Sequence, residues 1–235
     1  LVAGTTGSGK STTLAGMIDH INSNLKKHII TLEDPVEYVF DDNSCVIEQR
    51  EVGLDTPSYE KGLKHVMRQD PDVIMIGEMR DATSFRAAMS ASDTGHLVMS
   101  TLHTIDAPQS ISRVLDFFAS EEREQVRKQM VGTLKAIIVQ RMAVREDGGV
   151  VPAIEIMINT PTITKLISEN RTEKLHAAIE TGTDDGMQNF NQSLFQLVKD
   201  GVISKEEALD KASNPQALEM NFKGIFLSEG NRILN

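Results

Sequence analysis

Residues 4–11 form the segment whose residue types and spacing best fit a chemical task. They read Gly-Thr-Thr-Gly-Ser-Gly-Lys-Ser, the spacing G-x-x-x-x-G-K-[ST], between an apolar stub and a segment with helical periodicity. Glycines let backbone N–H groups turn toward phosphate oxygens, and the positive end of the following helix adds to the attraction. Lys10 supplies a charge for the β- and γ-phosphates, and the Ser11 hydroxyl can ligate Mg²⁺. We predict a nucleotide site made by Gly4, Thr5, Thr6, Gly7, Ser8, Gly9, Lys10, Ser11 and Thr12.

A carboxylate after a short apolar run is the second candidate for chemistry. Hydrolysis of a bound nucleotide needs a group that orients or activates water, and an acid at the end of a neighbouring strand can do this. Val73–Ile76 predicts a buried strand that delivers Glu78 to the carboxyl end of the sheet, where ligands of α/β proteins bind. The usual pattern has an aspartate at position 77, but this chain has Gly77. We predict that Glu78 is catalytic. The alternative interpretation is that Glu78 is an ordinary solvent-exposed residue at the end of a strand.

Three further acids follow the β-like run at residues 28–32. They are Glu33, Asp34 and Glu37, and Pro35 stiffens the turn between them. Because Gly77 cannot ligate a metal through a side chain, Glu33 and Asp34 are predicted to assist Mg²⁺, directly or through water. The alternative is a polar loop with ordinary surface acids.

Two histidines and several arginines complete the set of candidates. His96 and His103 lie seven residues apart, one on each side of a predicted strand. In an extended strand they would be about 20 Å apart, too far to bind the same metal ion. His103 suits a γ-phosphate sensor, although a strand-end histidine is often structural. Positive charge for the phosphates, within the chain or across a subunit contact, could come from Arg68, Arg80, Arg86 and Arg113, each of which could equally form a surface ion pair.

Composition limits the class of protein. The chain of 235 residues has 24 basic and 34 acidic residues, a net charge of −10, which argues against a nucleic-acid partner. Cys45 is the only cysteine, so neither an internal disulfide nor a cysteine-based zinc site can form, which fits a reducing cytoplasm. The longest purely apolar runs hold four residues, far below the roughly 18 that predict a membrane span, so no direct membrane insertion is expected.

The order of the periodic segments predicts an α/β fold with a mainly parallel sheet, because strands alternate with helices. After Thr160-Pro161 the strands give way to short helices, one over 187–198 and one opened by a capping box at Ser204. We therefore expect a core over residues 1–160 and a small helical subdomain over residues 161–235. Within the core we expect helices at about 10–25, from 56–58 to 69, 82–93, 107–118 and 121–132, and strands at 28–32, 43–53, 73–76, 96–101 and 151–158.

Four of these blocks, taken together, resemble the secretion and pilus motor ATPases and above all the type IV pilus retraction ATPases. The blocks are the phosphate loop, the acidic box Glu33–Glu37, the stretch Asp72–Asp81 and the histidine box His96–His103, in that family's order. The resemblance covers nearly the whole chain.

The resemblance implies a RecA-like P-loop core in a homo-hexameric ring with ATP and Mg²⁺ at subunit interfaces. It further implies that Glu78 is the catalytic glutamate, that Glu37 is the functional acid of its box and that His103 senses nucleotide. Family members carry a preceding PAS-like domain, which is expected upstream of residue 1. The expected activity is ATP hydrolysis that drives pilus retraction and twitching motility from the cytoplasmic face of the bacterial inner membrane. The expected partner is an inner-membrane platform protein; a second retraction ATPase is left open.

Two features bear on the direction of the motor. Extension and secretion ATPases typically carry a four-cysteine zinc loop after the core, whereas here residues 140–145 run almost directly into Gly148-Gly149 without a cysteine. This favours retraction. Against it, the family's helix motif A-I-R-N-L-I-R-E corresponds to residues 162–169, where both arginines are replaced, by Thr164 and Ser168.

The alternatives are an assembly or type II secretion ATPase without the zinc loop, a RecA-like translocase on nucleic acid, and a nucleotide-binding scaffold with weak turnover.

Overall fold

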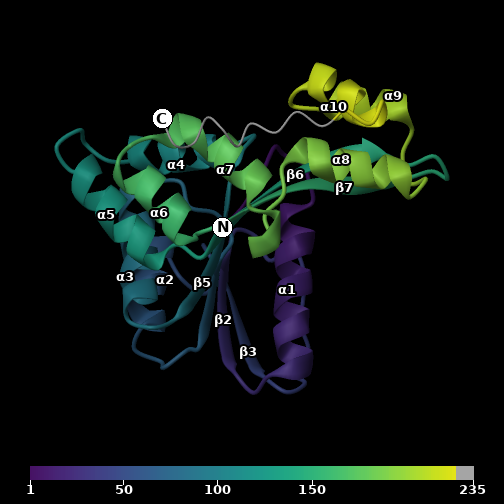
Figure 1. Cartoon of the computed structure of the whole chain (residues 1–235). Helices are drawn as coiled ribbons and strands as arrows, with labels where there is room; N and C mark the ends of the chain where they lie inside the picture. Colours follow the sequence, from purple (N-terminus) through teal and green to yellow (C-terminus); the bar gives the residue numbers. More distant parts are fainter. Residues whose placement is uncertain (226–235) are drawn as a thin grey trace. The chain divides into compact units, whose positions relative to one another are not determined.

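A computed structural model describes residues 1–225 of the chain (Figure 1). Two compact units can be distinguished: one holds residues 1–2, 10–102 and 113–134, and the other holds residues 3–9, 103–112 and the chain from Lys135 onward. Seven strands are hydrogen-bonded in the order β3-β2-β4-β5-β1-β6-β7, of which β1 spans Val2–Gly4. In the described residues no helix has the length and apolar character needed to cross a membrane.

The first unit is built on four parallel strands, β3-β2-β4-β5. The central pair is almost entirely buried, as expected for parallel strands covered on both faces. Parallel pairing brings the carboxyl ends of these strands to one edge, which is where the candidate acids follow in sequence. The strands are β2 (His28–Glu33), β3 (Val46–Glu51), β4 (Val73–Ile76) and β5 (Leu97–Leu102).

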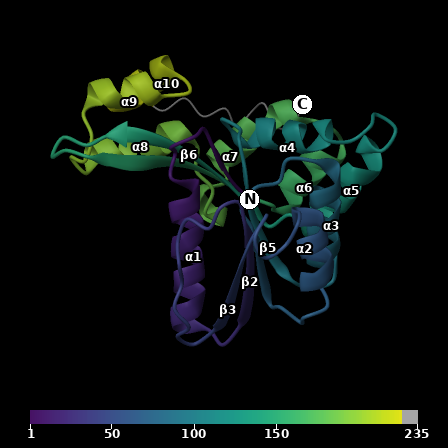
Figure 2. The same cartoon turned by 180° about the vertical axis from the view of Figure 1, so that it is seen from behind.

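Helices cover both faces of these four strands. Figures 1 and 2 show α1 on one side of the strands and α2 with α3 on the other. Leu14 and Ile18 of α1 are buried in one cluster with Ile29, Val73 and Met75. The helices of this unit are α1 (Lys10–Asn24), α2 (Tyr59–Val66), α3 (Ala82–Asp93) and α5 (Arg123–Thr133), and α4 (Ala107–Asp116) runs from the second unit into the first.

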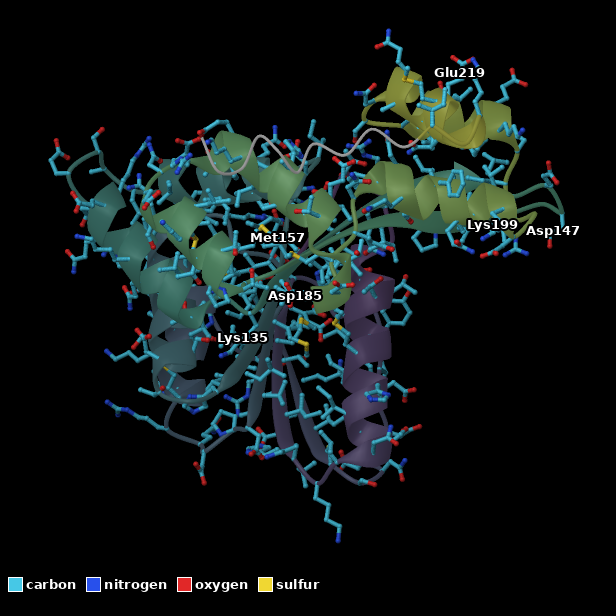
Figure 3. The ribbon with its side chains drawn as sticks, in the orientation of Figure 1. Lys135, Asp147, Met157, Asp185, Lys199 and Glu219 are labelled. Carbon is cyan, nitrogen blue, oxygen red and sulfur yellow. The ribbon has the colours of Figure 1, made fainter. Side chains whose placement is uncertain are left out.

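The second unit contains an antiparallel hairpin of β6 (Ala136–Val144) and β7 (Val150–Ile158). Figure 3 shows Asp147 at the tip of this hairpin. Ser193 of α8 accepts a hydrogen bond from the Ile154 N–H (3.0 Å) and so fixes that helix on the hairpin. The remaining elements are α6 (Pro161–Ser168), η1 (Thr172–Lys174), α7 (Leu175–Thr181), η2 (Thr183–Asp185), α8 (Phe190–Lys199), α9 (Lys205–Lys211) and α10 (Pro215–Phe222).

The predicted α/β class with a mainly parallel sheet is confirmed, and one strand was not expected. This strand is β6, which carries the polar residues Gln140 and Arg141 in its middle. They interrupt the apolar run that would predict a strand. After residue 160 only helices follow in the described residues, as predicted, and Ser204 caps α9 by accepting a hydrogen bond from the Glu207 N–H. The domain boundary near residue 160 stays a prediction, and residues 226–235 of the expected subdomain lie outside the described chain.

Asn22 ties α1 to the segment that carries the acidic box. This buried amide accepts hydrogen bonds from the N–H groups of Asn43 (3.1 Å) and Cys45 (3.2 Å) and donates one to the carbonyl oxygen of Asp41 (2.8 Å). A buried backbone group left without a partner costs about 1–3 kcal/mol. Asn22 therefore holds the segment between β2 and β3 against α1.

Replacing Asn22 with alanine should lower the free energy of unfolding by about 2–4 kcal/mol, because three backbone groups lose their partner at once. Urea denaturation of both proteins measures this difference. The exposed Asn24→Ala, in the same helical turn, is the control and should change stability by less than about 0.5 kcal/mol. Equal losses in the two variants would contradict the role assigned to Asn22.

Glu155 is a buried acid in the hairpin. Its Oε1 accepts a hydrogen bond from the Ala107 N–H (2.8 Å) at the start of α4. Burial raises the pKa of Glu155 to about 7; the charge of Asp106 acts in the same direction, whereas the Ala107 N–H and Arg141 oppose the shift. The protonated form is therefore favoured in the folded state relative to an unfolded chain.

This shift predicts a pH-dependent stability. Between the ordinary pKa of 4.5 and about 7 the folded chain binds more protons than the unfolded chain, so raising the pH should cost stability. The loss should approach roughly 3 kcal/mol and should be largely absent in Glu155→Gln. Urea denaturation at pH 5 and pH 8 tests this, with the exposed Glu121→Gln as control. A Glu155→Gln variant that kept the wild-type pH dependence would disprove the prediction.

Candidate functional site

The phosphate loop connects β1 to α1 and depends on glycine at its narrowest point. Gly4, Gly7 and Gly9 all have positive φ (150°, 77° and 85°), a region that side chains disfavour. A Cβ at Gly4 would collide with the Ser8 hydroxyl and lie 2.7 Å from the Gln140 carbonyl oxygen. The Ser8 hydroxyl is buried and has no hydrogen-bond partner in the described chain, so it is available to a ligand. The loop thus fits a closely approached phosphate chain.

Lys10 opens α1 and is almost fully buried. Burial lowers the pKa of its ammonium group, while the charges of Glu78 and Glu37 act in the opposite direction. These two acids belong to segments that follow different strands. The fold therefore gathers the predicted phosphate-binding lysine, the predicted catalytic acid and the acid of the predicted box within electrostatic range of one another.

Two hydrogen bonds fix the acidic box to the start of α1. The Ser11 hydroxyl donates to Oε1 of Glu37 (3.1 Å), and the hydroxyls of Thr12 and Tyr38 lie 2.8 Å apart. Because the Ser11 proton points to Glu37, the lone pairs of the Ser11 oxygen stay available to a cation. The donor set of hydroxyl and carboxylate oxygens suits Mg²⁺.

Glu33 and Asp34 differ in their surroundings. Glu33 is buried, and its Oε1 accepts hydrogen bonds from the Thr31 hydroxyl (2.6 Å) and from Nε2 of Gln49 (3.1 Å). These bonds stabilise the end of β2. Asp34 is exposed beside it. Their assistance to Mg²⁺ stays a prediction.

Glu78 lies two residues after β4, in a position that neighbouring strands define. The Gly77 N–H donates to the Leu32 carbonyl oxygen (2.8 Å), and the Thr101 hydroxyl donates to the Gly77 carbonyl oxygen (2.7 Å). The Glu78 side chain is 23% exposed, and its Oε2 accepts a hydrogen bond from the guanidinium of Arg80 (2.7 Å). Glu78 is thus presented at the strand edge while remaining accessible to a water molecule.

Tyr59 is a residue of this site that the motif patterns did not indicate. It is half-buried at the first position of α2, and burial raises its pKa to about 12; Asp34, Glu78 and Glu33 act in the same direction, whereas Arg80 opposes them. The phenol therefore lies within electrostatic range of the acids at the ends of β2 and β4. No spacing rule could find it, because its neighbours are distant in sequence.

The remaining candidates are more dispersed. His103 is exposed directly after β5 and belongs to the second unit, so its sensing role stays a prediction. His96 has a local structural role, because its Nδ1 lies 2.8 Å from the Ala91 carbonyl oxygen and 3.0 Å from the Thr94 hydroxyl. Within residues 1–225 no cluster of three His, Cys, Asp or Glu side chains could hold a metal by itself.

The four arginines also differ in their partners. Arg80 pairs with Glu78, Arg86 pairs with Glu122, Arg113 lies 5.0 Å from the centre of the Phe117 ring, and Arg68 is exposed beyond α2.

Comparison with known proteins gives consistent matches. A family model described as Type II/IV secretion system protein matches residues 1–148. The type IV pilus retraction ATPase PilT of Pseudomonas aeruginosa is 46% identical over 216 residues, 92% of this chain and 63% of PilT. The type IV pilus ATPase PilU of the same organism is 42% identical over 224 residues, 95% of this chain and 59% of PilU.

A solved structure agrees with these matches. The crystal structure of the pilus retraction motor PilT with bound ADP has a TM-score of 0.84 and 43% identity, over 93% of this chain and 62% of that one. The chain thus spans about 60% of the length of the curated relatives it matches.

The loop geometry predicts that Gly4→Ala weakens nucleotide binding. The added methyl group would collide with Ser8 and distort the loop, so ADP affinity should fall at least about tenfold. Isothermal titration with ADP measures this. Gly16→Ala is the matched control, because nothing lies within 4 Å of a Cβ on this exposed helical glycine. Unchanged ADP affinity in a folded Gly4→Ala protein would rule out this loop geometry.

Proposed function

Because the chain belongs to the Type II/IV secretion system protein family, we propose that it is the ATP-hydrolysing part of a motor that retracts type IV pili. The observation that supports this proposal is that Glu37 and Glu78 lie within electrostatic range of Lys10, the lysine of the G-x-x-x-x-G-K-S pattern. The likeness to PilT over nearly all of this chain supports retraction as the task.

ATP binding uses the first residues of the chain. Backbone N–H groups of residues 4–11 surround the phosphates, and the Lys10 ammonium neutralises charge on the β- and γ-phosphates. Lys10 lies where it is shielded from water, so its attraction to phosphate is stronger than that of a surface lysine. Thr12 adds a hydroxyl one residue after Ser11.

Mg²⁺, when bound, would neutralise phosphate charge and polarise the γ-phosphate. Ser11 would hold it directly, and Glu33 and Asp34 would act through water. The Ser11–Glu37 hydrogen bond supports this assignment, because it orients the hydroxyl oxygen.

Hydrolysis requires an oriented water. Glu78 accepts a hydrogen bond from the water and takes up its proton as the water oxygen attacks the γ-phosphorus. The bond from that phosphorus to the β,γ-bridging oxygen then breaks, which yields ADP and phosphate. Arg80 orients the Glu78 carboxylate through the 2.7 Å hydrogen bond, and Glu37 orders the polar groups around Ser11. His103 senses the γ-phosphate.

The motor is proposed to be a homo-hexamer in the cytoplasm, held at the inner face of the inner membrane through a platform protein. Arginines of a neighbouring subunit would complete the phosphate environment. Nucleic acid is not a proposed partner, in keeping with the net charge of −10.

Retraction is favoured over assembly or secretion by the β6–β7 turn. The Arg145 N–H donates to the Gly149 carbonyl oxygen (3.1 Å) and closes the hairpin, with no cysteine in between. In α6 the substituted positions make local bonds: Thr164 donates to Oδ1 of Asn159 (2.9 Å), and Ser168 donates to the Thr164 carbonyl oxygen (2.7 Å). Ile163 of the same helix stays buried, so packing persists where the family's arginine charges are lost.

Glu78→Gln in the full-length protein tests the function. The amide cannot take up the proton, so ATP should still bind while turnover falls by about 100-fold or more. Phosphate release and nucleotide titration measure the two effects separately. Cells with this variant should keep abundant surface pili and lose twitching.

The outcomes separate the candidate functions. If Glu78→Gln hydrolysed ATP at the wild-type rate, Glu78 would not be catalytic. If cells with this variant had no surface pili, the motor would instead act in pilus assembly. Glu60→Gln on the exposed side of α2 is the control and should leave both readouts unchanged.

A further inference from the structure

Tyr59 lies near the edge of the sheet where Glu33, Asp34 and Glu78 are found. Ser58 caps α2 by accepting a hydrogen bond from the Lys61 N–H (3.2 Å). One turn later, Gly62 lets α2 approach β2 closely, because a Cβ there would lie 2.9 Å from a methyl group of Leu32. This close packing places the first residue of α2 beside the ends of β2 and β4.

The phenol stands next to Gly77, which has no side chain. A Cβ at Gly77 would lie 3.4 Å from the Tyr59 hydroxyl oxygen, 3.4 Å from the Leu32 carbonyl oxygen and 3.5 Å from the Glu33 Cα. In many P-loop ATPases an aspartate in this region helps to hold Mg²⁺ and its water. Here the residue before Glu78 is Gly77, and the hydroxyl of Tyr59 from α2 lies beside it.

The hydroxyl is neutral and available. Its pKa of about 12 keeps the phenol protonated at neutral pH, and burial is the largest cause. Within residues 1–225 the Tyr59 hydroxyl makes no hydrogen bond. A neutral phenol can accept one hydrogen bond and donate another, so it can hold a water molecule among carboxylates without adding a charge.

We propose that the Tyr59 hydroxyl is a positioning group for the hydrolytic water: it hydrogen-bonds the water that Glu78 polarises and acts where Gly77 has no side chain. This inference rests on the proposed ATPase function. The phenol exchanges no proton in the reaction; the water donates one hydrogen bond to the phenol oxygen and its other proton moves to Glu78.

Tyr59→Phe in the full-length protein tests this role, with Glu60→Gln as the neighbouring control. Loss of one orienting hydrogen bond should lower kcat for ATP hydrolysis about 5- to 10-fold and leave KM for ATP within about twofold. The melting temperature should not fall, because the hydroxyl makes no hydrogen bond in the described chain. A purely structural tyrosine would give the reverse: a lower melting temperature and an unchanged kcat.

A pH profile gives the second readout. Difluorotyrosine introduced at position 59 loses its proton at lower pH than tyrosine, so the alkaline loss of kcat should move to lower pH. An unmoved profile, or wild-type kcat in Tyr59→Phe, would overturn the role of Tyr59 while leaving the ATPase assignment intact. A wild-type protein without ATP turnover would overturn the proposed function and this inference together.

Discussion

The parallel register of β2 against β4, in which Leu32 pairs with Ile76, is the constraint on which the site depends. Since the two strands end level with each other, the chain leaves the sheet at Glu33 and Gly77 side by side, and the Gly77 N–H bonds to the Leu32 carbonyl oxygen. A slip of one residue would turn each side chain of the shifted strand toward the opposite face of the sheet. Burial of Leu32 and Ile76 makes such a slip costly.

Charges of both signs lie close together at this edge, as the proposed binding of a polyphosphate requires. Lys10 is largely shielded from water, while Glu37 and Glu78 lie within electrostatic range of it. Arg80 balances Glu78, and Tyr59 stays neutral among the acids. The surroundings of Lys10 are therefore positive, and those of Glu37 and Glu78 are acidic. This separation suits hydrolysis of a phosphoanhydride, where charge develops on the transferred group.

The second unit contains a polar centre of a different kind. The guanidinium of Arg141 lies 3.8 Å from the centre of the Phe190 ring and donates to the carbonyl oxygens of Ile105 (3.1 Å) and Lys211 (3.0 Å). Glu155 accepts a hydrogen bond from the Ala107 N–H. The segment that follows His103 is thus fixed by the hairpin and by the C-terminal helices, so the position of that segment depends on how these helices pack.

By itself the sequence determined the phosphate loop, the acids at strand ends and the alternation of strands and helices, because these depend on local spacing and periodicity. Glycines in G-x-x-x-x-G-K-S and the apolar run Val73–Ile76 express their roles within a few residues. Three features were decided only by the tertiary structure. β6 pairs as an antiparallel strand, the Glu33 carboxylate accepts a hydrogen bond from Thr31, and Tyr59 lies beside Gly77. Tyr59 and Gly77 are 18 positions apart in the sequence, and the close packing of α2 on β2 at Gly62 brings them near each other. Such contacts arise from packing between elements, which no local pattern in the sequence encodes.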